Sequence, residues 1–165
     1  MIRGFIILLM GIDPGLRITG WGVIKVNGNE LTGISCGVIK TNNITSLSDR
    51  LNHIYVNLLD QINEYEPSEC AIEETFVNKN PLSALKLGHA RAAAMLSVAQ
   101  AGLKVSEYAP NKVKKSVVGV GHADKIQIMS MVRILLKGLN VNSNDEADAL
   151  AVAICHAHYR GAVNY

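Results

Sequence analysis

The segment at residues 5–13 constrains the fold more than any other part of the sequence. It is apolar at nearly every position, and it ends at Asp13, directly before a Pro-Gly turn. A strand that is apolar on both faces must be covered on both faces, which predicts a central strand of an α/β sheet. We interpret the segment as this buried strand and not as the core of a signal peptide, because no A-x-A-like cleavage site follows it.

The other elements follow from apolar spacing and from turn signals. Two further strands are predicted over residues 19–26 and 30–40, joined by an Asn-Gly hairpin turn. Apolar residues at helical spacing from Leu51 to Ile62 predict an amphipathic helix that is stopped by Pro67. Beyond it we expect strands over 70–75 and 103–108, a short basic helix from Pro110, and helices over 81–101, 124–136 and 144–159.

This order of elements, βββ-α-β-α-β-α-α, predicts an α/β fold built on a mixed five-stranded sheet with helices on both faces. The 165 residues suffice for one full core but not for two large domains, so we expect a single domain over residues 1–165. No apolar stretch reaches the roughly 18 residues that span a bilayer. Three widely spaced cysteines without a C-x-x-C pattern indicate reduced thiols. We therefore expect a cytoplasmic protein with no membrane association.

The net charge of +2 conceals an uneven distribution of charge along the chain. Residues 77–137 carry ten basic and only two acidic side chains, whereas the remainder carries six basic and twelve acidic ones. An acidic cluster beside a basic surface is what a metal-dependent enzyme that acts on a polyanion needs, so nucleic acid is a candidate substrate. The competing interpretation is that the lysines only form solvated helix faces.

Four carboxylates are the main candidates for chemistry. Hard divalent cations take oxygen ligands, and pairs of such ions cleave phosphodiesters. One of the four lies inside the apolar helical run Glu-Ala-Asp-Ala-Leu-Ala-Val-Ala-Ile, where an unpaired buried charge is costly. Two of them are three residues apart and so reach the same edge of one helix. The set is Asp13, Glu73, Asp145 and Asp148.

Three of these carboxylates have structural alternatives. Asp13 could simply accept backbone hydrogen bonds in its turn. Asp145, in the first turn of a helix, could complement the helix dipole. Strand alternation points Glu73 and Glu74 to opposite faces, and periodicity alone hardly decides which of the two shares a face with Asp13.

The helix that carries Asp145 offers further polar residues. Ser143 and Glu146 fit a capping box at its start. Near its end, Cys155, His156 and His158 look faintly like a metal cluster, but zinc sites need a second pair of ligands. We interpret these three as ordinary helix side chains.

Two residues in loops are candidates for contact with nucleic acid. Phe76 falls in a polar loop after Glu73, where it could stack on a splayed base or fold back to cover the core. His122, which precedes Lys125, could contact a phosphate or merely start a helix.

With these residues assembled, the chain resembles the RuvC family of bacterial Holliday-junction resolvases, in the RNase H-like superfamily. Five motifs carry the resemblance, in order and at the family's spacing. They are Gly-Ile-Asp-Pro-Gly-x-x-x-Thr-Gly-x-Gly at 11–22, Ala-Ile-Glu-Glu-Thr-Phe at 71–76, Ser-Ala-Leu-Lys-Leu-Gly-His-Ala-Arg at 83–91, Val-Lys-Lys-Ser-Val-Val-Gly-Val-Gly-His-Ala-Asp-Lys at 113–125, and Asp-Glu-Ala-Asp-Ala-Leu-Ala at 145–151.

The resemblance implies roles for individual residues. Asp13, Glu73, Asp145 and Asp148, but not Glu74, match the carboxylates that bind two Mg²⁺ ions per active site, for which Mn²⁺ substitutes. Lys114 and Lys125 match basic residues near the cleaved phosphate, with Lys125 counted as catalytic, and Phe76 matches an aromatic residue that helps to open the junction. The full set of expected DNA-binding residues is Phe76, Lys79, Lys86, Arg91, Lys112, Lys114, Lys115, His122 and Lys125.

The function that the resemblance implies is that of a crossover junction endodeoxyribonuclease. Such an enzyme resolves four-way DNA junctions by paired symmetric nicks with 5′-phosphate and 3′-hydroxyl ends, in recombination and repair. The implied partners are junction DNA, a second copy in a homodimer, and the RuvA–RuvB branch-migration complex. An actin-like ATPase or sugar kinase also begins its phosphate loop with Asp-x-Gly, but it needs a second domain. A non-catalytic junction-binding protein is disfavoured, because bare carboxylates repel DNA.

Overall fold

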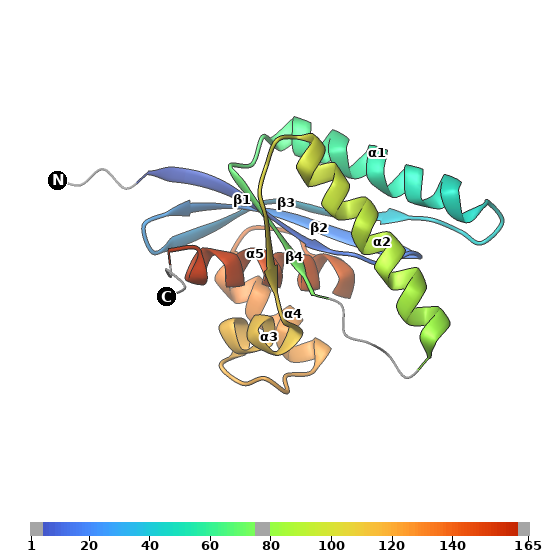
Figure 1. Ribbon diagram of the computed structural model, residues 1–165. Helices are drawn as coiled ribbons and strands as arrows, with labels where there is room; N and C mark the ends of the chain where they lie inside the picture. The colour runs from blue at the N-terminus through green and yellow to red at the C-terminus, as the bar shows by residue number, and fades with distance from the viewer. Residues whose placement is uncertain (1–4, 75–79, 162–165) are drawn as a thin grey trace.

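The computed structural model describes residues 5–74 and 80–161, which contain one five-stranded sheet and five helices (Figure 1). The strands are β1 (Ile6–Asp13), β2 (Ile18–Asn27), β3 (Glu30–Lys40), β4 (Glu69–Glu73) and β5 (Val105–Tyr108). The helices are α1 (Leu47–Tyr65), α2 (Pro81–Gln100), α3 (Pro110–Val118), α4 (Lys125–Leu135) and α5 (Asn144–Tyr159). The mixed α/β sheet is confirmed, and each element predicted by its residue range is present; three helices follow β5, one more than the order βββ-α-β-α-β-α-α contains.

The sheet has the strand order β3-β2-β1-β4-β5, which places β1 at its centre as the sequence predicted. β1, β2 and β3 form an antiparallel meander, whereas β4 pairs parallel to β1 and β5 parallel to β4. The predicted hairpin between β2 and β3 is confirmed, but its two turn residues are Gly28, with a positive φ of 59°, and Asn29, because Asn27 still pairs with Glu30.

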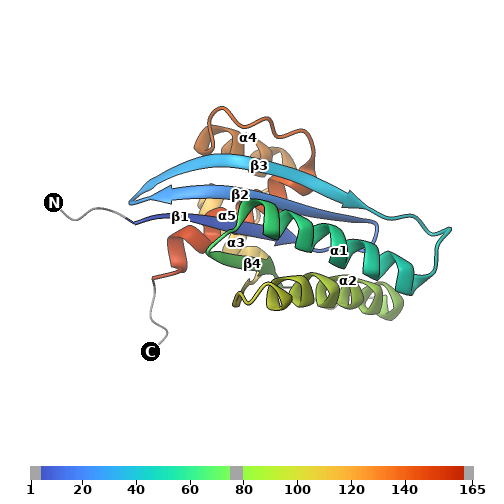
Figure 2. The ribbon, with the colours of Figure 1, turned by 90° about the horizontal axis from the view of Figure 1, so that it is seen from above.

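Helices cover both faces of the sheet (Figures 1 and 2). α1 and α2 pack on one face, and α5 lies on the other with α3 and α4 outside it. β1 alternates between the two cores: Leu9 faces α5, whereas Met10 and Ile12 face α1 and α2. The strand is uncovered only at its start, where Phe5 is 90% and Ile6 62% exposed.

Element boundaries differ from the prediction where local hydrogen bonds decide them. α1 begins four residues before Leu51, because the Ser46 hydroxyl caps it by accepting the backbone N–H of Asp49. β5 begins two residues later than predicted, because the backbone N–H of Leu103 donates to the carbonyl oxygen of Val98 near the end of α2. β4 ends at Glu73, and Thr75 lies outside the described residues.

The three cysteines are free thiols: Cys70 and Cys155 are buried and Cys36 is half-buried. Burial raises the pKa of Cys70 to about 12, so this thiol stays protonated. In the described ranges, no helix is both long and apolar enough to cross a membrane.

Candidate active site

The register of β4 on β1 brings two of the candidate carboxylates together. Ile12 pairs with Ile72 in parallel strands, so Asp13 and Glu73 follow at adjacent strand ends. Ala71 belongs to the core on the α5 side, and alternation puts Glu73 on that same face. Glu74 is exposed. The tertiary structure thus places Glu73, and not Glu74, beside Asp13.

Two glycines allow α5 to approach the sheet closely enough to join these strand ends. A Cβ on Gly20 would overlap the carbonyl oxygen of Asp145, and one on Gly11 would overlap the carbonyl oxygen of Ala149. Gly20 is the pairing partner of Asp13. The first turn of α5 therefore lies directly over the strand pair that ends at Asp13. This role of the two glycines was not predicted, although glycines within apolar strands are a signal of close backbone approach.

The turn after Asp13 is held by another residue. The buried Thr19 hydroxyl donates to the carbonyl oxygen of Gly15 at 2.8 Å and accepts the N–H of Gly15 at 3.3 Å. Thr19 therefore makes hydrogen bonds to the backbone of this turn, which is the structural role that the alternative interpretation gave to Asp13. Along β1, Asp13 shares the face of Leu9, so its carboxyl group lies on the α5 side with the other acids.

The start of α5 separates a structural acid from the candidate ones. Glu146 accepts the backbone N–H groups of Asn142 at 2.6 Å and Ser143 at 3.0 Å, and the Ser143 hydroxyl accepts the N–H of Glu146. The predicted capping box is therefore confirmed. Glu146 is occupied by the cap, whereas Asp145 and Asp148 remain on the side of Asp13.

The carboxyl groups perturb one another strongly. Burial raises the pKa of Asp13 well above its usual range, and the charges of Glu73, Asp148 and Asp145 raise it further. A hydrogen bond with the Glu73 side chain adds to the raised pKa of Asp13, and the same contact lowers the pKa of Glu73. Burial and the Asp148 charge nevertheless leave the pKa of Glu73 above its ordinary value.

Two lysines face this acidic group. Lys125 Nζ lies 3.9 Å from Asp148 Oδ2, with the lysine side chain 69% exposed and the aspartate 27%. Burial raises the pKa of Asp148, while Lys125 and Lys114 lower it. Both lysines also lower the pKa of Glu73. The structure thus brings together Lys114, from α3, and Lys125, from the start of α4, beside the carboxylates.

The donor set suits hard divalent cations. Within residues 5–74 and 80–161, no three His, Cys, Asp or Glu side chains are gathered closely enough to hold a metal ion as they stand. The four carboxylates interact as charges without converging on one point. All offer oxygen ligands, however, and their mutual repulsion is what a bound divalent cation offsets. The residues therefore fit such ions by the chemistry of their donor atoms.

The other predicted DNA-binding residues lie in varied surroundings. Lys86, Lys115 and His122 are exposed. Arg91 forms an ion pair with Glu107 of β5, so its guanidinium has a partner within the chain. Lys112 Nζ lies 4.1 Å from the ring centroid of Tyr159 and 5.4 Å from that of Tyr108. Phe76 and Lys79 lie outside the described residues. A DNA contact by each of these residues stays a prediction.

A second polar cluster, at the far end of α5, was missed. His156 is buried; its Nδ1 lies 2.7 Å from the Tyr108 hydroxyl and its Nε2 lies 2.8 Å from Glu69 Oε2. Arg160 also pairs with Glu69. No local pattern could have found this cluster, because Glu69 and His156 are 87 residues apart. The interpretation of His156 as an ordinary helix side chain overlooked these contacts.

Comparison with known proteins agrees with this geometry. The family model described as crossover junction endodeoxyribonuclease RuvC matches residues 9–156. The chain is 54% identical to the crossover junction endodeoxyribonuclease RuvC of Nitrobacter hamburgensis over 156 residues, which cover 94% of this chain and 92% of that protein.

Solved structures show the same arrangement. The RuvC of Thermus thermophilus, in complex with a Holliday junction substrate, is 34% identical with a TM-score of 0.86, covering 93% of this chain and 94% of that one. The yeast mitochondrial Holliday junction resolvase Ydc2 shares the fold at 12% identity, with a TM-score of 0.67 and coverage of 92% and 78%. RNase H-like resolvases are, as a class, metal-dependent nucleases. The chain belongs to the RuvC family of crossover junction endodeoxyribonucleases, which are Holliday-junction resolvases.

Proposed function

We propose that this chain acts as a single nuclease domain that nicks two opposed strands of a four-way DNA junction symmetrically. The ends left at each nick would be a 5′-phosphate and a 3′-hydroxyl. The observation that carries this proposal is the gathering of four carboxylates at one edge of the sheet, faced by two lysines. An acidic group of this kind repels DNA unless cations neutralise it, so it suits a metal-dependent phosphodiesterase.

Asp13, Glu73, Asp145 and Asp148 would hold two Mg²⁺ ions, with Mn²⁺ as a substitute. When bound, such ions supply an activated water and stabilise charge on the phosphate and on the leaving 3′ oxygen. Burial raises the pKa of Asp13, so metal binding by its carboxylate competes with binding of a proton. Lys125 and Lys114 then place positive charge next to the scissile phosphate, where negative charge develops during cleavage.

Paired nicks need two active sites, and we propose that a homodimer supplies them. A junction has near-twofold symmetry, which a C2 dimer matches. Support comes from the face opposite α5, where a hollow of about 520 Å³ between α1 and α2 is lined mainly by apolar side chains. Exposed leucines extend along α2 beside it: Leu82, Leu85 and Leu96. Work with the RuvA–RuvB branch-migration complex is proposed on family membership alone.

The test is cleavage of a labelled synthetic four-way junction beside a linear duplex of the same sequence, with Mg²⁺ and with chelator. We expect symmetric paired nicks on the junction only, and only with the metal. Ligation of the nicked product by DNA ligase without end repair checks the chemistry of the ends. Junction binding without nicks under every metal condition would contradict the proposal.

A further inference from the structure

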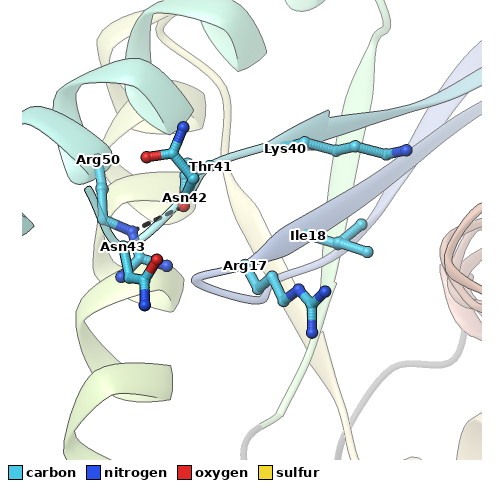
Figure 3. Close-up of a pocket in the computed structure, with 7 residues that line it drawn as sticks. All are labelled: Arg17, Ile18, Lys40, Thr41, Asn42, Asn43 and Arg50. Atoms are coloured by element: carbon cyan, nitrogen blue, oxygen red, sulfur yellow. Dashed lines mark hydrogen bonds between the residues drawn. The ribbon is translucent and has the colours of Figure 1, made fainter. Parts of the chain in front are cut away.

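A basic hollow lies beside the candidate active site, outside the set of residues expected to bind DNA. It measures about 610 Å³ and lies where β1 turns into β2 and where β3 ends (Figure 3). Three cationic side chains, two amides and a hydroxyl line it, and none of its lining residues is acidic. They are Arg17, Lys40, Arg50, Asn42, Asn43 and Thr41.

One of the three cations is held in place by the fold. Arg50 Nε donates to the Thr41 hydroxyl at 2.8 Å, as Figure 3 shows, and its Nη2 donates to the carbonyl of Leu16 at 3.4 Å. The Thr41 hydroxyl in turn donates to Leu16, and the Thr41 N–H donates to Arg17. A guanidinium fixed in this way loses little freedom when it binds an anion.

The other two cations are free to meet a ligand. Arg17 and Lys40 are exposed and project on either side of Ile18, the pairing partner of Lys40 (Figure 3). In the part of the chain that the structure describes, neither side chain makes a hydrogen bond or an ion pair. A second hollow of about 280 Å³, which shares Lys40 and Arg50 with the first, has one acidic residue in its lining, Asp49. Cations gathered without acids favour a polyanion.

The hollow shares a sheet edge with the carboxylates. Arg17 follows Asp13 through one turn, and Lys40 closes β3, which lies two strands from β1. Neighbouring strands lie about 4.8 Å apart, so the hollow is about 10 Å from the end of β1. DNA rises about 3.4 Å per base pair along its axis, so a separation of about 10 Å corresponds to a few nucleotides.

We propose that this basic hollow binds a backbone phosphate of the cleaved DNA strand, within a few nucleotides of the scissile phosphate. The inference rests on the proposed function, because it takes the scissile phosphate to lie at the carboxylates. The guanidinium of Arg50 and the amides of Asn42 and Asn43 offer donors to phosphate oxygens, while Arg17 and Lys40 supply free charge. Such contacts carry no sequence information and set the register of the strand.

The first test is the salt dependence of junction binding by the double variant Arg17→Gln/Lys40→Gln, measured in chelator so that no strand is cut. Loss of one phosphate contact should reduce the slope of log K against log salt by about 1. Arg50 is left intact because its hydrogen bonds brace the turn. The matched control is Lys104→Gln, which removes an exposed cation at the opposite sheet edge, just before β5. An unchanged slope in the double variant, with unaltered thermal unfolding, would overturn the inference.

The second test locates the phosphate. Junctions in which single phosphates near the cleavage site are replaced by neutral methylphosphonates are bound to the wild-type protein and to the double variant. We expect one position, within a few nucleotides of the cut, to weaken wild-type binding without weakening the variant further. Equal losses for both proteins at every position would show only a general positive field and would refute a phosphate subsite. If the wild-type protein never nicks the junction with Mg²⁺, the proposed function itself fails.

Discussion

Glu69 and Glu73 begin and end the same short strand and face the same helix, yet they lie in opposite electrostatic surroundings. At the start of β4, Arg160 and His156 hydrogen-bond to Glu69 and hold its pKa below the ordinary value. At the end of β4, burial and the charge of Asp148 hold the pKa of Glu73 above it. The same contrast runs along α5, from Asp148 in its second turn to His156 near its end.

We interpret this contrast as the difference between a structural acid and the acids that we propose as metal ligands. The fold supplies Glu69 with its own cations, so the charge of Glu69 stabilises the folded protein. The fold leaves Asp13, Glu73 and Asp148 facing one another, with Lys114 and with Lys125, 3.9 Å from Asp148, as the cations beside them. A protein retains such repulsion where an external cation relieves it during function.

The largest effect is expected from substitutions where the end of β4 meets the start of α5, the region that carries Glu73 and Asp148. Asp148→Asn or Glu73→Gln should lower the rate of junction cleavage by about a thousandfold or more, because each replaces a carboxylate that we propose as a metal ligand by a neutral amide. Junction binding should stay intact or strengthen, since a negative charge near DNA is lost. The measurement is single-turnover cleavage beside gel-shift binding.

The matched control for this prediction is Glu74→Gln, which neutralises the exposed neighbour of Glu73 on the other face of the chain. It should cleave at the wild-type rate. Loss of binding in the Asp148 and Glu73 variants would show that these carboxylates are structural.

The next largest effect is expected from a substitution at Gly20, where the start of α5 contacts β2. Gly20→Ala places a methyl group against the carbonyl of Asp145, so α5 must shift away from the strands. Overpacking of this kind costs about 1–3 kcal/mol of unfolding free energy. Cleavage should fall as well, because Asp145 and Asp148 move with the helix. Urea unfolding and cleavage rates measure the two effects.

Gly88→Ala on α2 controls for the added methyl group, because nothing lies within 4 Å of a Cβ at that position. It should retain full activity. A Gly20→Ala protein with wild-type stability and activity would show that α5 does not need a glycine at this position to pack on the sheet.

Substitution of Glu69, at the start of β4, should have the opposite effect: it should lower stability and leave cleavage unchanged. Glu69→Gln removes the charged partner of Arg160 and weakens the hydrogen bond from His156. Because the pair with Arg160 is partly exposed, we expect a loss of about 1 kcal/mol in unfolding free energy. Cleavage per folded molecule should not change, measured well below the unfolding temperature. A cleavage defect as large as that of Asp148→Asn would contradict the interpretation of Glu69 as a structural acid.

The smallest expected effect is in the dependence of stability on pH. The pKa of Asp13 is raised by folding, so its stabilising contribution is present at pH values below the ordinary carboxyl pKa and is lost as pH rises through the raised value. The pKa of Glu69 is lowered by folding, so its contribution is present above the ordinary carboxyl pKa and is lost as pH falls through the lowered value.

Without metal at neutral pH, Asp13→Asn should therefore stabilise the protein, by an amount of the order of 1 kcal/mol, while it abolishes cleavage. Urea unfolding in chelator at mildly acid and at neutral pH measures this gain, which should shrink at the lower pH. Added Mg²⁺ should stabilise the wild type more than the variant. A variant that is less stable than the wild type at neutral pH would contradict the electrostatic account.

Local signals in the chain were sufficient for most of the architecture. The apolar spacing and the turns predicted every strand and helix in order, because periodicity and turn chemistry act over a few residues. The boundaries that differ, such as the start of α1 and of β5, depend on single hydrogen bonds by Ser46 and Leu103. The capping box of Ser143 and Glu146 was predictable because both partners lie within one turn.

The sequence by itself determined the order of elements and singled out the carboxylates, since a charge such as Asp148 within an apolar helical run stands out along the chain. Only the tertiary structure decided that Glu73 and not Glu74 faces Asp13, because that choice depends on how β4 registers against β1. It alone paired Glu69 with His156 and placed Arg17 beside Lys40 and Arg50. These neighbours come from different strands and helices, and the packing of α5 and α1 on the sheet sets their distances.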